Sequence, residues 1–147
     1  MASPLILIVE ARYYAHIADE LVRGAVAALE AAGARHERIT VPGAFEIPAA
    51  VNLAHLSRRG FDGFVALGCV IRGETSHYDL VCNEAARGLQ ELAVRERLAI
   101  GFGVLTVENE AQALARADIA GKNKGGEAVT ACLAMIALKQ RFGIAGI

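Results

Sequence analysis

The chain has 147 residues, enough for one domain with a single substantial core, and we expect one domain over residues 1–147. Hydrophobic residues make up 54% and charged residues 21% of the sequence, a balance that excludes a disordered chain. The formal net charge of -1 favours neither nucleic acid nor an anionic membrane, so small molecules are the expected partners.

The three cysteines, Cys69, Cys82 and Cys132, lie far apart and lack CxxC spacing. This pattern argues against a disulfide framework and against a zinc cluster, so we expect reduced thiols and no metal. The first apolar run, residues 5–9, is too short for a signal peptide or a membrane span, and we expect a cytoplasmic protein. The high apolar content also predicts that neighbouring subunits cover part of the surface.

The first half of the chain alternates between strand and helix patterns. Apolar runs and helical spacing predict a buried strand at residues 5–10, a helix at 15–32, an edge strand at 35–41 and a helix from Ile47-Pro48 to residues 58–60. Gly33 stands where the first helix would stop, and Pro42-Gly43 forms a turn after the second strand.

The second half continues the alternation. Residues 63–71 (GFVALGCVI) are the most apolar strand candidate and predict a central strand. Later patterns predict a helix at residues 78–96, a strand at 98–105, a short helix at 109–116 and a last helix at 124–142. Because strands and helices alternate with short connections, we predict an α/β fold with a four-stranded parallel sheet between two helix layers.

In open parallel sheets, ligands bind beyond the carboxyl ends of the strands, where the direction of winding reverses. Loop segments with polar, glycine or aromatic residues follow each of the first three predicted strands, at residues 11–14, 42–46 and 72–77. These three loops should therefore converge on one site.

The loop at residues 73–76 (GETS) leads directly into a predicted helix. Its backbone N–H groups and hydroxyls could bind an anion, with phosphate as the natural candidate, helped by the helix dipole. The alternative is that Thr75 or Ser76 only caps the helix. The loop lacks the lysine of a Walker motif, which argues against a nucleoside triphosphate.

His77 follows that loop, at the start of the helix. Histidine exchanges protons readily near neutral pH, so His77 is the candidate proton-transfer residue. An ordinary exposed residue at a helix start is the alternative. Cys69 resembles a nucleophile only superficially, because no activating base is near it in sequence, and a small buried thiol is the favoured interpretation.

Aromatic and cationic residues complete the set of candidates. Tyr13, Tyr14 and Phe45 could stack on a planar heterocycle, although core packing is the more common role of such residues. The backbone of residues 44–46 could read a heterocycle edge. Arg116 and the basic loop at residues 121–126 (GKNKGG) could pair with phosphate, or could simply be solvated.

Four segments together resemble the lumazine synthase family. They are VPGAFEIP (41–48), GCVIRGETSHYD (68–79), GFGVLTVEN (101–109) and Arg116 with GKNKGGEA (121–128). The resemblance covers essentially the whole chain. It implies a flavodoxin-like three-layer sandwich. It also implies condensation of 5-amino-6-ribitylaminouracil with 3,4-dihydroxy-2-butanone 4-phosphate to 6,7-dimethyl-8-ribityllumazine, phosphate and water, without a cofactor.

The resemblance assigns proton transfer to His77 and substrate binding to a wider set. The matching residues are Tyr13, Ala44, Phe45, Glu46, Cys69, Val70, Ile71, Glu74, Thr75, Phe102, Arg116 and Lys124. The family delivers the residues that match Phe102, Arg116 and Lys124 from an adjacent subunit, and Arg116 would grip phosphate. The resemblance therefore implies a homopentamer, and some members assemble into shells of 60 subunits.

Three departures from the usual family pattern involve four positions. Tyr13-Tyr14 replaces phenylalanine or tryptophan followed by a small polar residue, Cys69 replaces a common alanine, and Lys122 replaces a common glycine. Tyr14 keeps open a second interpretation, a slow or inactive paralogue that binds lumazine or riboflavin. A flavodoxin-like regulatory domain is a third interpretation, but a phosphate-acceptor site would need an acidic pair where only Glu10 is present.

Overall fold

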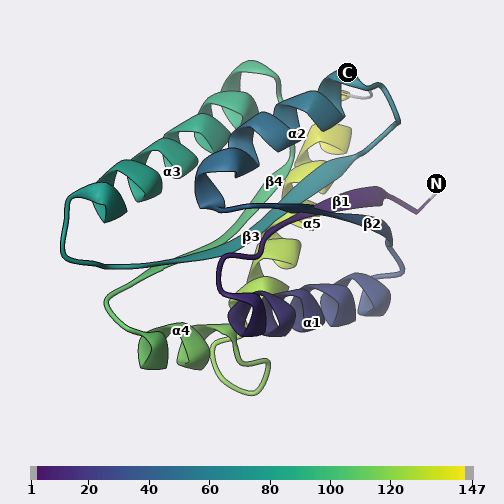
Figure 1. Cartoon of the computed structure of the whole chain (residues 1–147). Coiled ribbons are helices and arrows are strands. Elements are labelled where there is room, and N and C mark those ends of the chain that lie inside the picture. The colour runs from purple at the N-terminus through teal and green to yellow at the C-terminus, as the bar shows by residue number, and fades with distance from the viewer. Residues whose placement is uncertain (1–2, 145–147) are drawn as a thin grey trace.

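A computed structural model describes residues 3–144. The elements in chain order are β1 (Leu5–Ala11), α1 (Ala15–Ala31), β2 (Arg35–Val41), η1 (Ala44–Glu46), α2 (Ile47–Leu56), β3 (Gly63–Ile71), α3 (His77–Arg95), β4 (Ile100–Val107), α4 (Glu110–Ala117) and α5 (Lys124–Arg141) (Figure 1). No helix within this range is both long enough and apolar enough to cross a membrane.

The four strands form one parallel sheet in the order β2-β1-β3-β4. The two apolar runs, β1 and β3, lie side by side in the middle, with Val9 opposite Ala66 in the register. β2 lies at one edge and is more exposed, as its weak alternation predicts. The predicted central third strand and edge second strand are thus confirmed.

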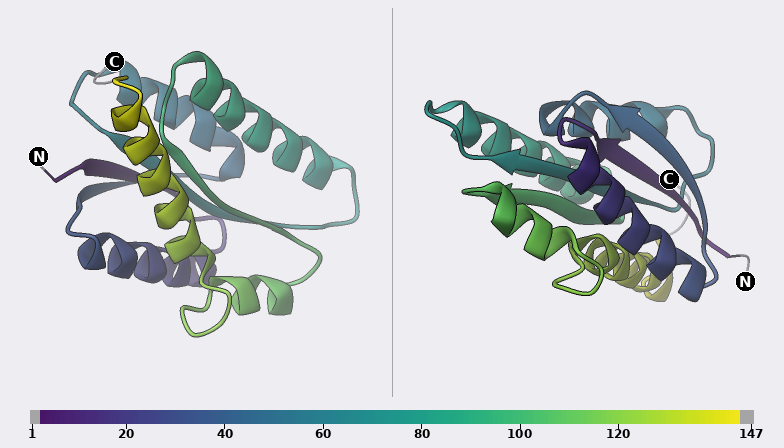
Figure 2. Two further views of the ribbon diagram at one scale, coloured as in Figure 1. Left: turned by 180° about the vertical axis from the view of Figure 1, so that it is seen from behind. Right: turned by 60° about the horizontal axis from the view of Figure 1, so that its bottom comes forward.

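Helices cover both faces of the sheet, which confirms the three-layer sandwich (Figures 1 and 2). Successive side chains of β1 point to opposite faces. Ile6 and Ile8 pack in the cluster that includes residues of α1, α4 and α5, whereas Leu7 and Val9 pack in the cluster that includes residues of α2 and α3. The two central strands therefore need apolar residues at nearly every position.

The predicted end of the first helix at Gly33 is confirmed. Gly33 adopts a left-handed φ of 71° just after α1, and its N–H donates to Glu30 O at 3.1 Å. The N–H of Ala34 donates to Leu29 O at 2.9 Å. These two bonds form a Schellman motif, which satisfies carbonyl groups that the helix end leaves open.

Several element ends differ from the sequence prediction by one or a few residues; for example, α2 ends at Leu56 and not at residues 58–60. β4 runs from Ile100 to Val107 instead of residues 98–105, because Thr106 pairs with Val70 in the register and faces solvent at the sheet edge. Its polar side chain therefore does not end the strand. The short 3-10 turn at Ala44–Glu46 was not predicted, since the Pro42-Gly43 turn carries no signal for the conformation of the residues after it.

Close contact between α1 and α5 depends on Gly125. A Cβ atom built at this position would lie 2.1 Å from Leu21 O, so even alanine would force the helices apart. We expect Gly125→Ala to lower the free energy of unfolding by about 1–3 kcal/mol through overpacking. Urea unfolding followed by circular dichroism measures this change.

Gly73→Ala is the matched control, because a Cβ there meets nothing within 4 Å. An equal midpoint shift in both variants would contradict the steric explanation.

Candidate functional site

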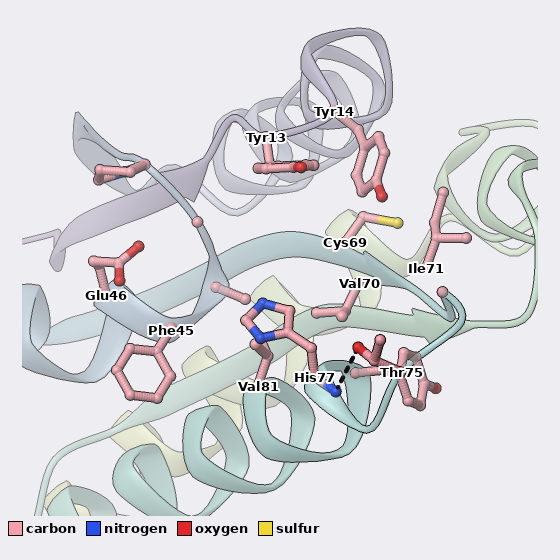
Figure 3. A pocket seen from close by; sticks show the side chains of 15 residues that line it. Tyr13, Tyr14, Phe45, Glu46, Cys69, Val70, Ile71, Thr75, His77 and Val81 are labelled. Carbon is pink, nitrogen blue, oxygen red and sulfur yellow. Dashed lines mark hydrogen bonds between the residues drawn. The ribbon is translucent and has the colours of Figure 1, made fainter.

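A pocket of about 550 Å³ lies at the carboxyl ends of β1, β2 and β3 (Figure 3). Winding reverses between β1 and β3, so this is the place where an open parallel sheet binds ligands. The lining residues are Tyr13, Tyr14, Pro42, Gly43, Ala44, Phe45, Glu46, Cys69, Val70, Ile71, Gly73, Thr75, His77, Tyr78 and Val81. The predicted convergence of the three loops is confirmed.

The pocket brings together most of the residues singled out from the sequence. The predicted residues that line it are Tyr13, Ala44, Phe45, Glu46, Cys69, Val70, Ile71, Thr75 and His77. Glu74 belongs to the same loop as Thr75 but does not line the pocket. Phe102, Arg116 and Lys124 do not line it either.

Sequence reasoning missed two lining residues on the first turns of α3. Val81 stands four residues after His77, so both face the same side of the helix. Tyr78 lines the pocket from the next position along the chain. Helical phase, counted from His77 once it is accepted as a site residue, would have predicted Val81.

His77 is the first residue of α3, and its side chain is exposed and reaches into the pocket (Figure 3). The backbone N–H of His77 donates to Thr75 Oγ1 at 3.3 Å. Thr75 therefore does help to shape the helix start, as the capping alternative holds, although Ser76 makes no side-chain cap bond. The loop at residues 73–76 still leads to the helix N-terminus, where backbone N–H groups favour an anion.

Two aromatic rings form the side of the pocket that follows β1. The rings of Tyr13 and Tyr14 meet edge to face, with centroids 5.0 Å apart and planes at 71°. The Tyr13 side chain is 76% exposed, so core packing does not explain it. Tyr14 is half-buried, and burial raises the pKa of its phenol, which therefore stays a hydrogen-bond donor at neutral pH.

Arg72 lies directly after β3, and its contacts connect the loop at residues 73–76 to its neighbours. Its guanidinium stacks 4.3 Å from the ring centroid of Tyr78, and its Nε donates to both carboxylate oxygens of Glu108 at 3.0 Å. Burial raises the pKa of the Tyr78 phenol. These contacts hold the end of β3, the end of β4 and the start of α3 together.

The pocket wall within residues 3–144 contains no lysine or arginine. The predicted phosphate ligands lie elsewhere on the chain: Arg116 Nη1 donates to Gln112 O at 3.1 Å, and Lys124 Nζ pairs with Glu127 at 3.1 Å. Phe102 is 46% exposed on the edge strand β4. No three His, Cys, Asp or Glu side chains in the described part of the chain could hold a metal ion together.

Cys69 is buried in the pocket wall, and burial raises the pKa of its thiol to about 12. Because the thiolate is the reactive form, Cys69 should stay protonated and inert at pH 8. We expect iodoacetamide to label Cys69 far more slowly in the folded protein than in urea, as measured by mass spectrometry of peptides. Equal labelling rates in the two states would show that the thiol is accessible and ionised.

An open parallel sheet with an aromatic, loop-lined pocket at its switch point is typical of α/β proteins that bind small molecules. Residues 4–140 match the family described as 6,7-dimethyl-8-ribityllumazine synthase. The chain belongs to this family.

Several bacterial relatives carry the name 6,7-dimethyl-8-ribityllumazine synthase. The protein from Bartonella tribocorum is 59% identical over 141 residues, which cover 96% of this chain and 93% of the relative. The protein from Sphingopyxis alaskensis is 60% identical over 139 residues, or 95% and 97% of the two chains. The protein from Agrobacterium fabrum is 55% identical over 147 residues, or 97% and 99%.

Proposed function

We propose that the chain condenses 5-amino-6-(D-ribitylamino)uracil with 3,4-dihydroxy-2-butanone 4-phosphate to give 6,7-dimethyl-8-ribityllumazine, phosphate and water, a transferase reaction of riboflavin biosynthesis. The observation that carries this proposal is the position of His77, at the helix start and inside an aromatic pocket. The relatives named above, which share more than half of their residues with this chain, support the same reaction.

The pyrimidine binds on the side of the pocket that follows β1 and β2. The exposed ring of Tyr13 offers a face for stacking. The 3-10 turn at Ala44–Glu46 offers backbone groups and one carboxylate to the heterocycle edge. Cys69, Val70 and Ile71 supply the apolar floor, with the Cys69 thiol as a packing group and not as a nucleophile.

The phosphate binds near residues 73–76, at the N-terminus of α3, with Glu74 and Thr75 on the same loop. A phosphate monoester carries up to two negative charges, and the pocket wall in the described chain offers no cationic side chain of lysine or arginine. Arg116 and Lys124 of an adjacent subunit supply the missing charge, and Phe102 of that subunit closes the pocket. A shared site requires an oligomer whose contacts close into a ring, and the family resemblance implies that this ring is a homopentamer.

His77 moves protons during the reaction. The amine of the uracil attacks the ketone carbonyl, and loss of water gives an imine. Removal of a proton from the carbon chain then accompanies loss of phosphate, and ring closure releases further water. Each of these steps needs a general acid or base, and an imidazole that reaches into the pocket from the helix start is suited to both.

Incubation of the protein with both substrates tests the proposal directly, because the product is fluorescent. Product formation well above the uncatalysed rate is the expected result. If the rate did not exceed the uncatalysed one while the pyrimidine still bound, the binding paralogue that Tyr14 suggests would be the correct interpretation.

Loss of the imidazole should slow turnover without preventing substrate binding. We expect His77→Ala to lower kcat by roughly ten- to a thousandfold, in the range of a lost general acid or base. Stopped-flow fluorescence at saturating substrate measures this. His36→Gln, on the edge strand β2 and outside the pocket wall, is the control and should keep the full rate. An unchanged kcat in His77→Ala would mean that substrate positioning alone carries the reaction.

Loss of the Arg116 guanidinium should weaken binding of the phosphorylated substrate and not of the pyrimidine. We expect Arg116→Ala to raise the apparent KM for the phosphorylated substrate by about tenfold or more, because a charge-assisted pair is lost, and to change the KM for the pyrimidine much less. Arg59→Ala removes a surface pair with Glu37 and is the matched control. Equal increases for both substrates would argue against a phosphate role.

A further inference from the structure

The side chain of Arg12 spans the two-residue turn that carries the aromatic rings of the pocket. On one side of this turn, Arg12 Nη1 donates to Glu10 Oε1 in β1 at 2.7 Å. On the other side, Nη2 bonds to Asp19 in α1 and lies 3.5 Å from the carbonyl oxygen of Ala15, the first residue of that helix. The guanidinium thus connects the strand end to the helix start across Tyr13 and Tyr14.

The anchor of this connection is a buried carboxylate. Among the residues that the structure describes, Glu10 is the only polar or charged residue that is buried, at 1% exposure. Arg38 donates to it from β2 through Nε at 2.8 Å and Nη2 at 3.0 Å. Burial opposes ionisation of Glu10, but the hydrogen bonds from Arg38 and Arg12 outweigh it and hold its pKa below the ordinary value. The carboxylate is therefore a fixed, charged anchor at neutral pH.

The backbone of Arg12 links the same turn to a second pocket loop. The N–H of Arg12 donates to Val41 O at 3.3 Å, and Val41 is the residue before Pro42-Gly43. The turn then enters α1 through bonds from Ile17 N–H and Ala18 N–H to Tyr14 O, at 3.1 and 3.0 Å. The backbone on both sides of Tyr13 is thus fixed by residues outside the pocket.

The Tyr13 ring has little packing of its own to hold it. It is largely exposed, and its one aromatic neighbour in the described chain is Tyr14, which meets it edge to face (Figure 3). A ring that is mobile loses entropy when it stacks on a ligand, whereas a ring that is already oriented does not. Whatever fixes the turn therefore contributes to binding without touching the ligand.

We propose that Arg12, anchored on Glu10, is a positioning residue that fixes the Tyr13-Tyr14 turn so that the aromatic pair is ready to stack on the heterocycle. The proposal rests on the proposed function for the identity of that heterocycle, the ribitylaminouracil. Arg12 would then help to determine the affinity for the pyrimidine although it contacts neither substrate.

Two variants that each remove one hydrogen-bond donor from Glu10 distinguish a positioning role of Arg12 from a general effect on stability. Arg12→Gln and Arg38→Gln each remove a guanidinium from Glu10, but the hydrogen bonds of Arg38 in the described chain go to Glu10 alone. We expect Arg12→Gln to raise the KM for the pyrimidine by about tenfold, with little change in kcat or in the KM for the phosphorylated substrate. Arg38→Gln should leave both KM values within about twofold of wild type. Equal KM changes in the two variants would overturn the proposal.

Direct binding tests the inference independently of turnover. The three tyrosines of the sequence, Tyr13, Tyr14 and Tyr78, all line the pocket, and the chain has no tryptophan. Intrinsic fluorescence therefore reports ligand stacking in the intact protein. Titration with ribitylaminouracil alone should show a Kd about tenfold higher in Arg12→Gln than in wild type. If wild type binds the pyrimidine but forms no lumazine, the proposed reaction fails while this titration still tests Arg12.

A milder variant covers the case in which Arg12→Gln does not fold. Asp19→Asn weakens the α1 end of the connection and leaves Glu10 paired with both arginines. We expect an increase in Kd for the pyrimidine that is smaller than in Arg12→Gln, with an unchanged midpoint of thermal unfolding. A wild-type Kd in Asp19→Asn would contradict the proposal.

Discussion

The site depends on the reversal of winding between β1 and β3. The two strands are hydrogen-bonded neighbours, yet the chain leaves them toward opposite faces of the sheet, so no crossover helix covers the crevice between their carboxyl ends. The segments that follow β1, β2 and β3 meet there because parallel strands end at the same edge. A stacking ring, a turn with open backbone groups and a helix start thus come together from residues far apart in the sequence.

A similar arrangement of an arginine and an aspartate is found on two sides of the pocket. Arg12 follows β1 and Arg72 follows β3, and each reaches an aspartate in the first turns of the next helix, Asp19 and Asp79 respectively. Each guanidinium thereby brackets the short loop that carries the site residues. The two arginines differ in their other contacts. Arg12 pairs with the buried carboxylate of Glu10, whereas Arg72 stacks on the ring of Tyr78, which lines the pocket. Binding residues are often placed on loops, and here a long, planar side chain connects the ends of β1 and β3 to the helices that follow their loops.

Local patterns predicted the fold well because buried strands and amphipathic helices have distinct periods. The boundary of β4 was missed because polar Thr106 sits on an edge strand, and the 3-10 turn at Ala44–Glu46 had no sequence signal. The burial of Glu10 was also missed: it depends on Arg38, 28 residues away. The loops that line the pocket could be predicted from the strand order and from the family resemblance. Val81 could be predicted only by counting one helical turn from His77. Phe102, Arg116 and Lys124 lie outside the pocket of one chain, and only the family resemblance connects them with the site.

We propose that the reaction needs side chains from two subunits, because the pocket wall within residues 3–144 of one chain contains no lysine or arginine for the phosphate. Subunit mixing tests it most directly. His77→Ala and Arg116→Ala chains, unfolded and refolded together, should form mixed rings in which about one quarter of the sites carry both intact side chains. If the site is shared, lumazine formation by the mixture, at low concentration of the phosphorylated substrate, should rise well above the mean of the two separately refolded variants. A rate equal to that mean would show that each site is built within a single chain.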